Sequence, residues 1–409
     1  MSDRESIDGG PPIPGDPFED RAAACRRRLE AVGADVAVCG PSPNFAYATG
    51  FEEEPSERHL LLFLPRAGDS VVVAPAMYEG ELAVRWVEDV RHWDDGDDVV
   101  SLLESVLSEV LDRDAESEGG GPRDDGGPGD DRILVDDRLW ARFTHDLRSV
   151  RPDAVYGLAS EVFEPLRIRK DERELEALER AARLADRVSL ELRSRGDELV
   201  GTTESELAAE IDRLLAEGGG TEPAFPTIVA AGPNGARPHH RAGDREIEPG
   251  DPVVLDFGAF VPATYQTGTG HYPGDQTRTV VFGGDPPPAY ETAHEVVREA
   301  QEAAIDAIEP GVAVGEIDRV ARSVIEEAGY GDAFVHRTGH GVGLEVHEAP
   351  YVVEGNDRDL EPGMVFSVEP GIYLEGRFGV RIEDLVVVTD DGARRLNETP
   401  RGWRPLSDE

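Results

Sequence analysis

Four acidic residues and one histidine have the types and the spacing of a metal site. Asp256 lies six residues after the glycine of one Glu-Pro-Gly sequence, and Glu369 lies six residues after the glycine of another. A further acid follows each of them, Asp275 and Glu383. Because carboxylates brought together on apolar strands repel one another, divalent cations are their natural compensation. The imidazole of His340 shifts the preference toward first-row ions such as manganese or cobalt.

Two cations held by shared carboxylates indicate hydrolytic chemistry. Such ions lie about 3.5–4 Å apart and lower the pKa of a water molecule, so that it attacks at neutral pH. Taken singly, each acid is more simply explained as a turn or a helix cap, and only the matching acids of the two copies favour a metal site. His347 and Glu348 begin like the HExxH helix of zinc proteases, but the fifth residue is Tyr351, which excludes that site.

Two similar segments must position these acids. Thr203 and Glu206 form a capping-box pattern at the start of an amphipathic helix. A similar apolar face recurs 110 residues later, and the matching inward residues are Leu207, Ile211, Leu214 and Leu215, then Ile317, Ala321, Val324 and Ile325. Each helix precedes a glycine-rich stretch with histidines, then Glu-Pro-Gly and a strand that ends in an acid. We therefore expect the copies to pack around a pseudo-twofold axis where the four acids meet.

The 409 residues are enough for two domains. Between 18 and 165, alternating apolar and amphipathic runs predict an N-terminal α/β domain. A helix from Asp171 to about Arg193 opens the second domain, 166–402. Residues 1–17 are expected to be a disordered tail and 115–131 a flexible acidic insertion. The strands expected in the first domain are 36–39, 60–64, 71–74, 133–135 and 154–156, and the helices are about 19–31, 77–87, 98–112 and 138–147.

The composition restricts the partners and the compartment. The net charge is -44, with 85 acidic residues against 41 basic ones, and Lys170 is the single lysine. Self-repulsion of this size is screened in molar salt, which predicts a halophilic protein, with an acidic mesophilic one as the alternative. Nucleic acid is not an expected partner, because phosphate binding needs clustered basic residues. Two cysteines, Cys25 and Cys39, no apolar leader and no membrane-length apolar run predict a soluble cytoplasmic protein.

Six stretches resemble the pita-bread metallopeptidases, the family of Xaa-Pro aminopeptidase, prolidase and methionine aminopeptidase. In family order, between about 225 and 390, they are FPTIVAAGPNGARPHH, VVLDFG, DQTRTV, HRTGHGVGLEVHEAPYV, MVFSVEPGIYL and VRIEDLVVV. The segment NFAYATGF, followed by LLLFL and VVVAP, resembles the N-terminal domain of the proline-specific members. The resemblance implies an α/β N-terminal domain of the creatinase/prolidase type. It also implies an α+β pita-bread catalytic domain with a pseudo-twofold repeat.

The resemblance also implies a metal ligand set. Asp256 would bind one ion, Asp275 and Glu383 would bridge both ions, and His340 and Glu369 would complete the second. Glu369 would also act as the general base that carries a proton to the leaving nitrogen. The cofactors implied are two divalent ions, with manganese or cobalt preferred and zinc or iron as alternatives.

Other residues take roles around the ligands through the same resemblance. His239 and His347 would donate to the scissile carbonyl oxygen. His336 would line the substrate pocket, and Arg381 would orient Glu383 or the substrate. Thr277 would donate a hydrogen bond to a metal-binding carboxylate.

The implied function is an exopeptidase that removes an N-terminal residue from a peptide, with Xaa-Pro bonds as the preferred substrate and a homodimer as the assembly. Xaa-Pro aminopeptidase and Xaa-Pro dipeptidase stay open. The alternatives are a methionine aminopeptidase-like enzyme and a non-catalytic pita-bread peptide-binding protein, while all five ligands argue against a metal-free creatinase-like hydrolase. The chain departs from the family pattern at 261–274, which is expected to be an inserted loop at the edge of the site. Gly274 stands there in place of a serine.

Overall fold

The computed structural model describes residues 17–117 and 131–406. The predicted tail lies outside these ranges except for Pro17, and the predicted acidic insertion lies outside them except for 115–117 and 131. The described chain divides into two compact units. The N-terminal unit comprises residues up to 167 together with 264–270, and the C-terminal unit comprises 168–263 and the chain from 271 onward.

The N-terminal unit is built on a six-stranded sheet with the order β4-β3-β2-β1-β5-β6. Strands β1 and β2 and strands β2 and β3 pair antiparallel, and the other pairs are parallel. Alternating buried side chains of these strands pack against α4 in one apolar core. The strands are β1 (Val36–Cys39), β2 (Leu61–Pro65), β3 (Val71–Pro75), β4 (Asp89–Trp93), β5 (Arg132–Val135) and β6 (Val155–Leu158). The helices are α1 (Pro17–Val32), α2 (Pro43–Thr49), η1 (Ala76–Tyr78), α3 (Glu79–Leu82), α4 (Val99–Ser117), α5 (Ala141–Val150) and α6 (Ser160–Arg167).

The first half of the C-terminal unit combines two helices with a three-stranded sheet of the order β11-β8-β7. Its helices are α7 (Glu172–Arg195) and α8 (Glu204–Glu217), with the short η2 (Gly196–Leu199) and η3 (Gly232–Ala236). Its strands are β7 (Ile228–Ala231), β8 (Pro252–Phe257), β9 (Phe260–Thr264), β10 (Thr269–Pro273) and β11 (Gln276–Val281).

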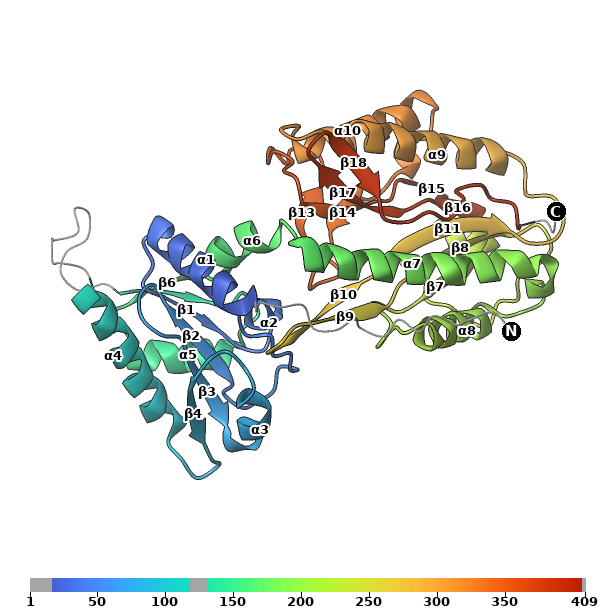
Figure 1. Ribbon diagram of the computed structural model, residues 1–409. Coiled ribbons are helices and arrows are strands. Elements are labelled where there is room, and N and C mark those ends of the chain that lie inside the picture. Colours follow the sequence, from blue (N-terminus) through green and yellow to red (C-terminus); the bar gives the residue numbers. More distant parts are fainter. Residues whose placement is uncertain (1–16, 118–130, 407–409) are drawn as a thin grey trace. The chain divides into compact units, whose positions relative to one another are not determined.

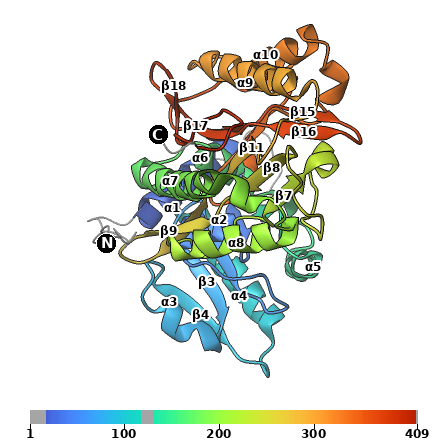
Figure 2. The same cartoon turned by 90° about the vertical axis from the view of Figure 1, so that its right-hand side faces the viewer.

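The second half repeats this plan with a larger sheet, β13-β12-β14-β17-β18, and a separate β15-β16 hairpin. The central strands of the two halves, among them β8, β11, β14 and β17, lie between α7 and the pair α9 and α10 (Figures 1 and 2). Its helices are α9 (Tyr290–Asp306), α10 (Val314–Glu327) and η4 (Gly331–Ala333). Its strands are β12 (Gly339–Gly341), β13 (Glu348–Val352), β14 (Val365–Val368), β15 (Gly371–Leu374), β16 (Phe378–Arg381), β17 (Asp384–Thr389) and β18 (Gly392–Arg395).

The two repeated helices, α8 and α10, have the apolar faces that the sequence predicted, and α8 also has the predicted capping box. At the start of α8, Thr203 accepts from the backbone N–H of Glu206, whose side chain accepts from the N–H of Thr203, so the capping box is complete. The predicted apolar face of α8 is fully buried. On α10, Ile317, Ala321 and Ile325 are buried in the same way. Among the described helices, none has the length and apolar character that crossing a lipid bilayer requires.

The segment predicted to be an inserted loop is instead a β-hairpin, formed by β9 and β10. Its tip, 264–270, belongs to the N-terminal unit. The backbone N–H of Thr269 donates to the carbonyl of Gly50 at 3.0 Å, and the ring of Tyr265 packs edge-on against Phe18. A Cβ on Gly268 would lie 2.6 Å from the Cα of Gly50, so only glycine allows this approach. The tip of the hairpin therefore packs within the N-terminal unit.

Candidate metal centre

Strand register brings the acids of each half together. In the first half, Asp256 lies in β8 opposite Thr277 of β11, and Asp275 immediately precedes β11. In the second half, Val368 of β14 pairs with Asp384 of β17. That pairing places Glu369, just after β14, beside Glu383, just before β17.

Glycines allow the strands to approach closely around these acids. A Cβ on Gly258 would lie 1.7 Å from the carbonyl oxygen of Gly274, and one on Gly339 would lie 1.8 Å from that of Ser367. Gly274 itself faces the carbonyl oxygen of Ala181 in α7, which a Cβ would meet at 2.8 Å. The departure from serine at 274 is therefore explained by local packing, because no side chain fits there.

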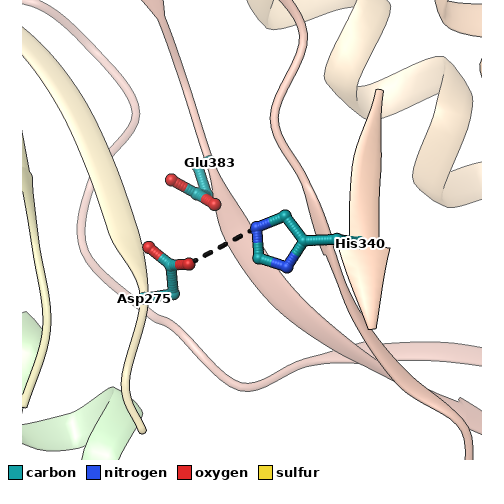
Figure 3. A group of neighbouring side chains, drawn as sticks. All are labelled: Asp275, His340 and Glu383. Carbon is teal, nitrogen blue, oxygen red and sulfur yellow. Dashed lines mark ion pairs between the residues drawn. The ribbon is translucent and has the colours of Figure 1, made fainter. Parts of the chain in front are cut away.

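Asp275, His340 and Glu383 point toward one another from both halves (Figure 3). Each offers one ligand atom, and these atoms all lie within 4.8 Å of one another. The Nε2 atom of His340 is 3.6 Å from Oδ2 of Asp275 and 3.4 Å from Oε1 of Glu369. Asp256 lines the same cavity. All five predicted ligands thus converge on one place.

Burial dominates the electrostatics of this cluster. Burial first, and then neighbouring carboxylates, raise the pKa values of Asp275 and Glu383 well above their ordinary range. Burial also raises the pKa of Asp256, although the guanidinium of Arg381 opposes the shift. Burial raises the pKa of Glu369 to about 7, and burial lowers the pKa of His340 to about 3. The imidazole is therefore neutral at pH 7, as metal binding requires.

Two buried oxygens indicate that the donor set fits divalent cations. Oδ1 of Asp256 and Oε1 of Glu383 are buried and accept no hydrogen bond from the described residues. A buried carboxylate oxygen without a partner is costly, and a cation would satisfy it. Carboxylates with one imidazole suit first-row divalent ions.

The cluster lies at the base of a cavity of about 550 Å³. Its lining includes every residue for which the sequence predicted a ligand, catalytic or substrate-binding role: His239, Asp256, Asp275, His336, His340, His347, Glu369, Arg381 and Glu383. His239 and His347 are exposed. Phe225, Pro226 and Ile228 supply an apolar wall. Among the described residues that line it, none belongs to the β9–β10 hairpin.

Arg381 contacts a different acid from the one anticipated. Its Nη2 donates to Oδ2 of Asp256 at 2.5 Å, and its Nε donates to Oγ1 of Thr277 at 3.0 Å. Thr277 in turn donates to Oε2 of Glu383 at 2.6 Å, as the sequence predicted for a metal-binding carboxylate. Arg381 therefore orients Asp256 directly and reaches Glu383 only through Thr277.

The sequence motifs did not predict a role for Tyr373. Its hydroxyl accepts from Nη1 of Arg381 and lies 2.9 Å from Nε2 of His336. Nδ1 of His336 lies 2.7 Å from the carbonyl oxygen of Arg337. These contacts fix a neutral tautomer, with Nδ1–H donating to the carbonyl and Nε2 accepting from the tyrosine. Burial lowers the pKa of His336 to about 4, which agrees with that state.

A second missed group is the carboxylate that holds the loop of His239 and His240. Glu204, fully buried at the start of α8, accepts from the N–H groups of Ala231 and Gly243, from the amide of Asn234 and from Nε2 of His240 at 2.7 Å. In the second half, buried Asp318 of α10 does the same for the loop before His340. It accepts from both the N–H and the hydroxyl of Thr338. Only the capping pattern marked Glu204 in the sequence.

Comparisons with known proteins agree with this arrangement. The sequence matches metallopeptidase family M24 over residues 176–390 and the creatinase/prolidase N-terminal domain over 21–116. It is 39% identical to a Mycobacterium tuberculosis protein named probable dipeptidase PepE, over 94% of this chain and 96% of the relative. It is 35% identical to the Xaa-Pro dipeptidase of Lactobacillus delbrueckii subsp. lactis, over 92% of this chain and 96% of that one.

A solved structure extends the likeness to the whole fold. The prolidase of Thermococcus sibiricus superposes with a TM-score of 0.83 at 34% identity, covering 96% of this chain and 100% of that one. A metallopeptidase family implies divalent metal ions, and the buried acids and His340 fit them. The chain is therefore a peptidase that belongs to metallopeptidase family M24, with an N-terminal domain of the creatinase/prolidase type.

Proposed function

We propose that this peptidase hydrolyses Xaa-Pro dipeptides with the help of two divalent metal ions. The observation that carries the proposal is the convergence of four buried acids and His340 from two halves of the C-terminal unit. The relatives named above as dipeptidases match this chain over more than nine-tenths of its length, which supports the substrate class.

The residues proposed to hold the ions are Asp256, Asp275, His340, Glu369 and Glu383. Manganese or cobalt is proposed, with zinc or iron as alternatives, because the set is mostly carboxylate with one imidazole. When bound, the ions supply Lewis-acid stabilisation of charge on oxygen and lower the pKa of water. Asp275 and Glu383, which with His340 each offer a ligand atom within 4.8 Å of the others, are the residues proposed to be shared by both ions.

The proton is proposed to move through Glu369. In the metal-free protein burial raises its pKa to about 7, and its place beside His340 in the cavity suits a group that accepts a proton from water and returns it to the leaving nitrogen. His239 and His347, both exposed in the cavity, are proposed to donate to the scissile carbonyl oxygen. His336 is proposed to face the substrate, and Arg381 to hold Asp256 in place.

Arg337 supports a dipeptidase over an aminopeptidase. It lines the cavity, and its guanidinium stacks 4.6 Å from the ring centre of Tyr351. In the described part of the chain its side chain forms no ion pair, and its charge acts on Glu369 from a longer distance, where it lowers the pKa of that acid. An anionic ligand is a suitable partner, and a dipeptide offers its terminal carboxylate next to the scissile bond. An aminopeptidase that acts on longer peptides finds no carboxylate next to the scissile bond, and so has no such use for this arginine.

A peptide panel tests this proposal. Ala-Pro, Ala-Pro-Ala and Met-Ala-Ser are assayed with added manganese or cobalt, for the wild type and for Arg337→Gln. We expect Ala-Pro to be the best substrate and Arg337→Gln to raise its KM about tenfold or more, with a smaller effect on Ala-Pro-Ala. Preferred cleavage of Met-Ala-Ser, or no cleavage by the metal-loaded protein, would contradict the proposal.

The cellular setting is proposed from charge and cysteines. Both cysteines are buried and unpaired, which fits a reducing cytoplasm. The net charge of -44 supports adaptation to molar salt. Thermal unfolding in 0.1 and 2 M potassium chloride tests this, and equal melting temperatures would contradict it.

A homodimer is also proposed, because Met77, Val84 and Trp140 are exposed apolar side chains of the N-terminal unit. Light scattering at working salt measures the assembly.

A further inference from the structure

The only lysine of the chain is buried. Lys170 is the one lysine among 41 basic residues. Its side chain has 0% exposure, and its Nζ donates to Oε1 of Glu348 at 2.8 Å. Glu348 is also buried, with 8% of its side chain exposed. Arginine serves at every other basic position, so this is the single place where the chain uses a compact ammonium group.

The surroundings explain why a compact group is used there. A Cβ on Gly343 would lie 2.2 Å from Oε1 of Glu348, so the carboxylate fills the space that this glycine leaves open. The backbone N–H of Lys170 donates to the carbonyl of Gly363 at 2.8 Å, and a Cβ on Gly363 would lie 3.2 Å from the carbonyl oxygen of Lys170. Nζ of Lys170 donates to Oε1 of Glu348 and to the carbonyl of Ile168, whereas a guanidinium is larger and planar and carries five N–H donors in a fixed geometry.

The ion pair adjoins a residue of the cavity. Glu348 begins β13 and directly follows His347, and neighbouring residues in an extended chain point to opposite sides. His347 lines the cavity, and its ring packs edge-on at 4.0 Å against the ring of His340. On the other side, Lys170 fixes the start of the segment that leads into α7. Glu348 is paired with Gly341 across β12 and β13.

We propose that the buried Lys170–Glu348 ion pair is a positioning device for His347. It ties the first residue of β13 to the segment before α7, so that the preceding imidazole keeps a fixed place beside His340. Lys170 is a positioning residue and does not itself contact the substrate. The inference rests on the proposed function only in that His347 acts on the substrate.

A double-mutant cycle with His347 tests whether Lys170 acts through it. The variants are Lys170→Met, His347→Ala and the combination, assayed on Ala-Pro at saturating metal. We expect Lys170→Met to lower kcat about 10–100-fold with less than a threefold change in KM. In the His347→Ala background, Lys170→Met should lower kcat by no more than about twofold. An equal loss in both backgrounds would overturn the proposal.

A second variant separates positioning from stability, because Lys170→Met alone takes the ammonium group away from a buried carboxylate and lowers stability. Replacing both partners, in Lys170→Met/Glu348→Met, removes that penalty. We expect the melting temperature to return to within a few degrees of the wild type, whereas kcat stays low. A crystal structure of the double variant should show a displaced His347 ring. Wild-type kcat, or an unmoved ring, would overturn the proposal.

The ring position does not depend on any activity. If the wild type failed to cleave Ala-Pro but the ring moved in the double variant, the proposed substrate would be wrong and the positioning role would stand. Lys170→Arg tests the argument about size. We expect it to lower both the melting temperature and kcat, and a variant identical to the wild type in both would overturn that argument.

Discussion

The two halves of the C-terminal unit share a plan but contribute different chemistry. The first half brings Asp256, in β8, close to Asp275, just before β11, through a strand pairing that is regular from end to end. The second half brings Glu369 and Glu383 in the same way and adds His340, on a strand whose pairing with β13 is irregular after that residue. Duplication thus accounts for the four acids, and a local irregularity accompanies the one imidazole.

Hydrogen bonds cross between the halves at the centre. Thr277 of the first half donates to Glu383 of the second, and Arg381 of the second half donates to Asp256 of the first. Neither half completes the surroundings of its own acids. The geometry of the site therefore depends on the packing of the two halves against each other, and substitutions in either half should lower activity.

The acids also differ in how far burial shifts them: the pKa values of Asp275 in the first half and of Glu383 in the second are both raised well above their ordinary range. In the second half, the pKa of Glu369 lies at about 7, within reach of proton transfer at neutral pH. In the first half, burial and neighbouring acids raise the pKa of Asp275 well above its ordinary range, and no such proton-transfer role is proposed for it. The first half is thus proposed to act as ligand only, and the second as ligand and proton carrier.

The largest effect is expected when a proposed bridging acid is removed. Glu383→Gln should lower kcat/KM for Ala-Pro by more than about a thousandfold, because a neutral amide no longer balances the cations. Glu375→Gln, on an exposed residue of the same half, should change it by less than twofold or so. Steady-state kinetics measures both variants, with circular dichroism as a folding check. Activity retained in Glu383→Gln would show that this acid is not required.

The next effect concerns the pH dependence of stability in the metal-free protein. Glu369 has its pKa raised from 4.5 to about 7 on folding, so folding favours its protonated form. Its contribution is present below pH 4.5 and is lost as the pH rises toward 7, by about 3 kcal/mol at most. Between pH 5 and 8, the wild type should therefore lose stability relative to Glu369→Gln in chemical denaturation. Parallel curves for the two proteins would contradict the assigned pKa.

A smaller effect is expected from the crossing hydrogen bonds. Arg381→Lys keeps the charge but loses the donors to Thr277 and Tyr373, and it should lower kcat about 10–100-fold. Thr277→Val, which removes the matching bond from the other half, should give a loss of similar size. A strong effect of one change and none of the other would show that the halves do not support each other.

The smallest effect is expected at the two buried carboxylates that hold loops, Asp318 and Glu204. Asp318→Asn weakens the hold on the loop that carries His340 and should lower kcat about tenfold. Glu204→Gln affects the loop of His239 and His240, which holds no proposed ligand, and should lower kcat/KM only a few-fold. Kinetics at saturating metal distinguish the two, and a larger effect of Glu204→Gln would reverse the proposed ranking of the loops.

The sequence predicted what repeats or alternates along the chain. Five strands of the N-terminal sheet and the two repeated helices were anticipated to within about two residues, because their apolar residues follow a clear period. Strand β4 was missed because its DVRHW sequence is polar and half-buried. Helices α2 and α6 were missed as short segments. The β9–β10 hairpin was taken for an inserted loop because Asp256 and Asp275 lie 19 residues apart, farther than in the family pattern.

The residues of the candidate site were predictable where the same motif recurs at the same spacing in both halves. All the proposed ligands were therefore predicted from the sequence. Their roles stay predictions. The contacts of Tyr373, of Glu204 with His240 and of Lys170 with Glu348 were not predictable, because each joins residues distant in sequence through packing. The Lys170–Glu348 pair, for instance, spans 178 residues.

The most direct test of the proposed two-metal site is the metal content of the full-length protein. After loading with manganese and removal of free metal, we predict about two ions per chain by elemental analysis, and fewer than one in Glu383→Ala. Anomalous scattering from crystals should place these ions between Asp275, His340 and Glu383. A wild-type protein that cleaves Ala-Pro while holding no ion would contradict the account.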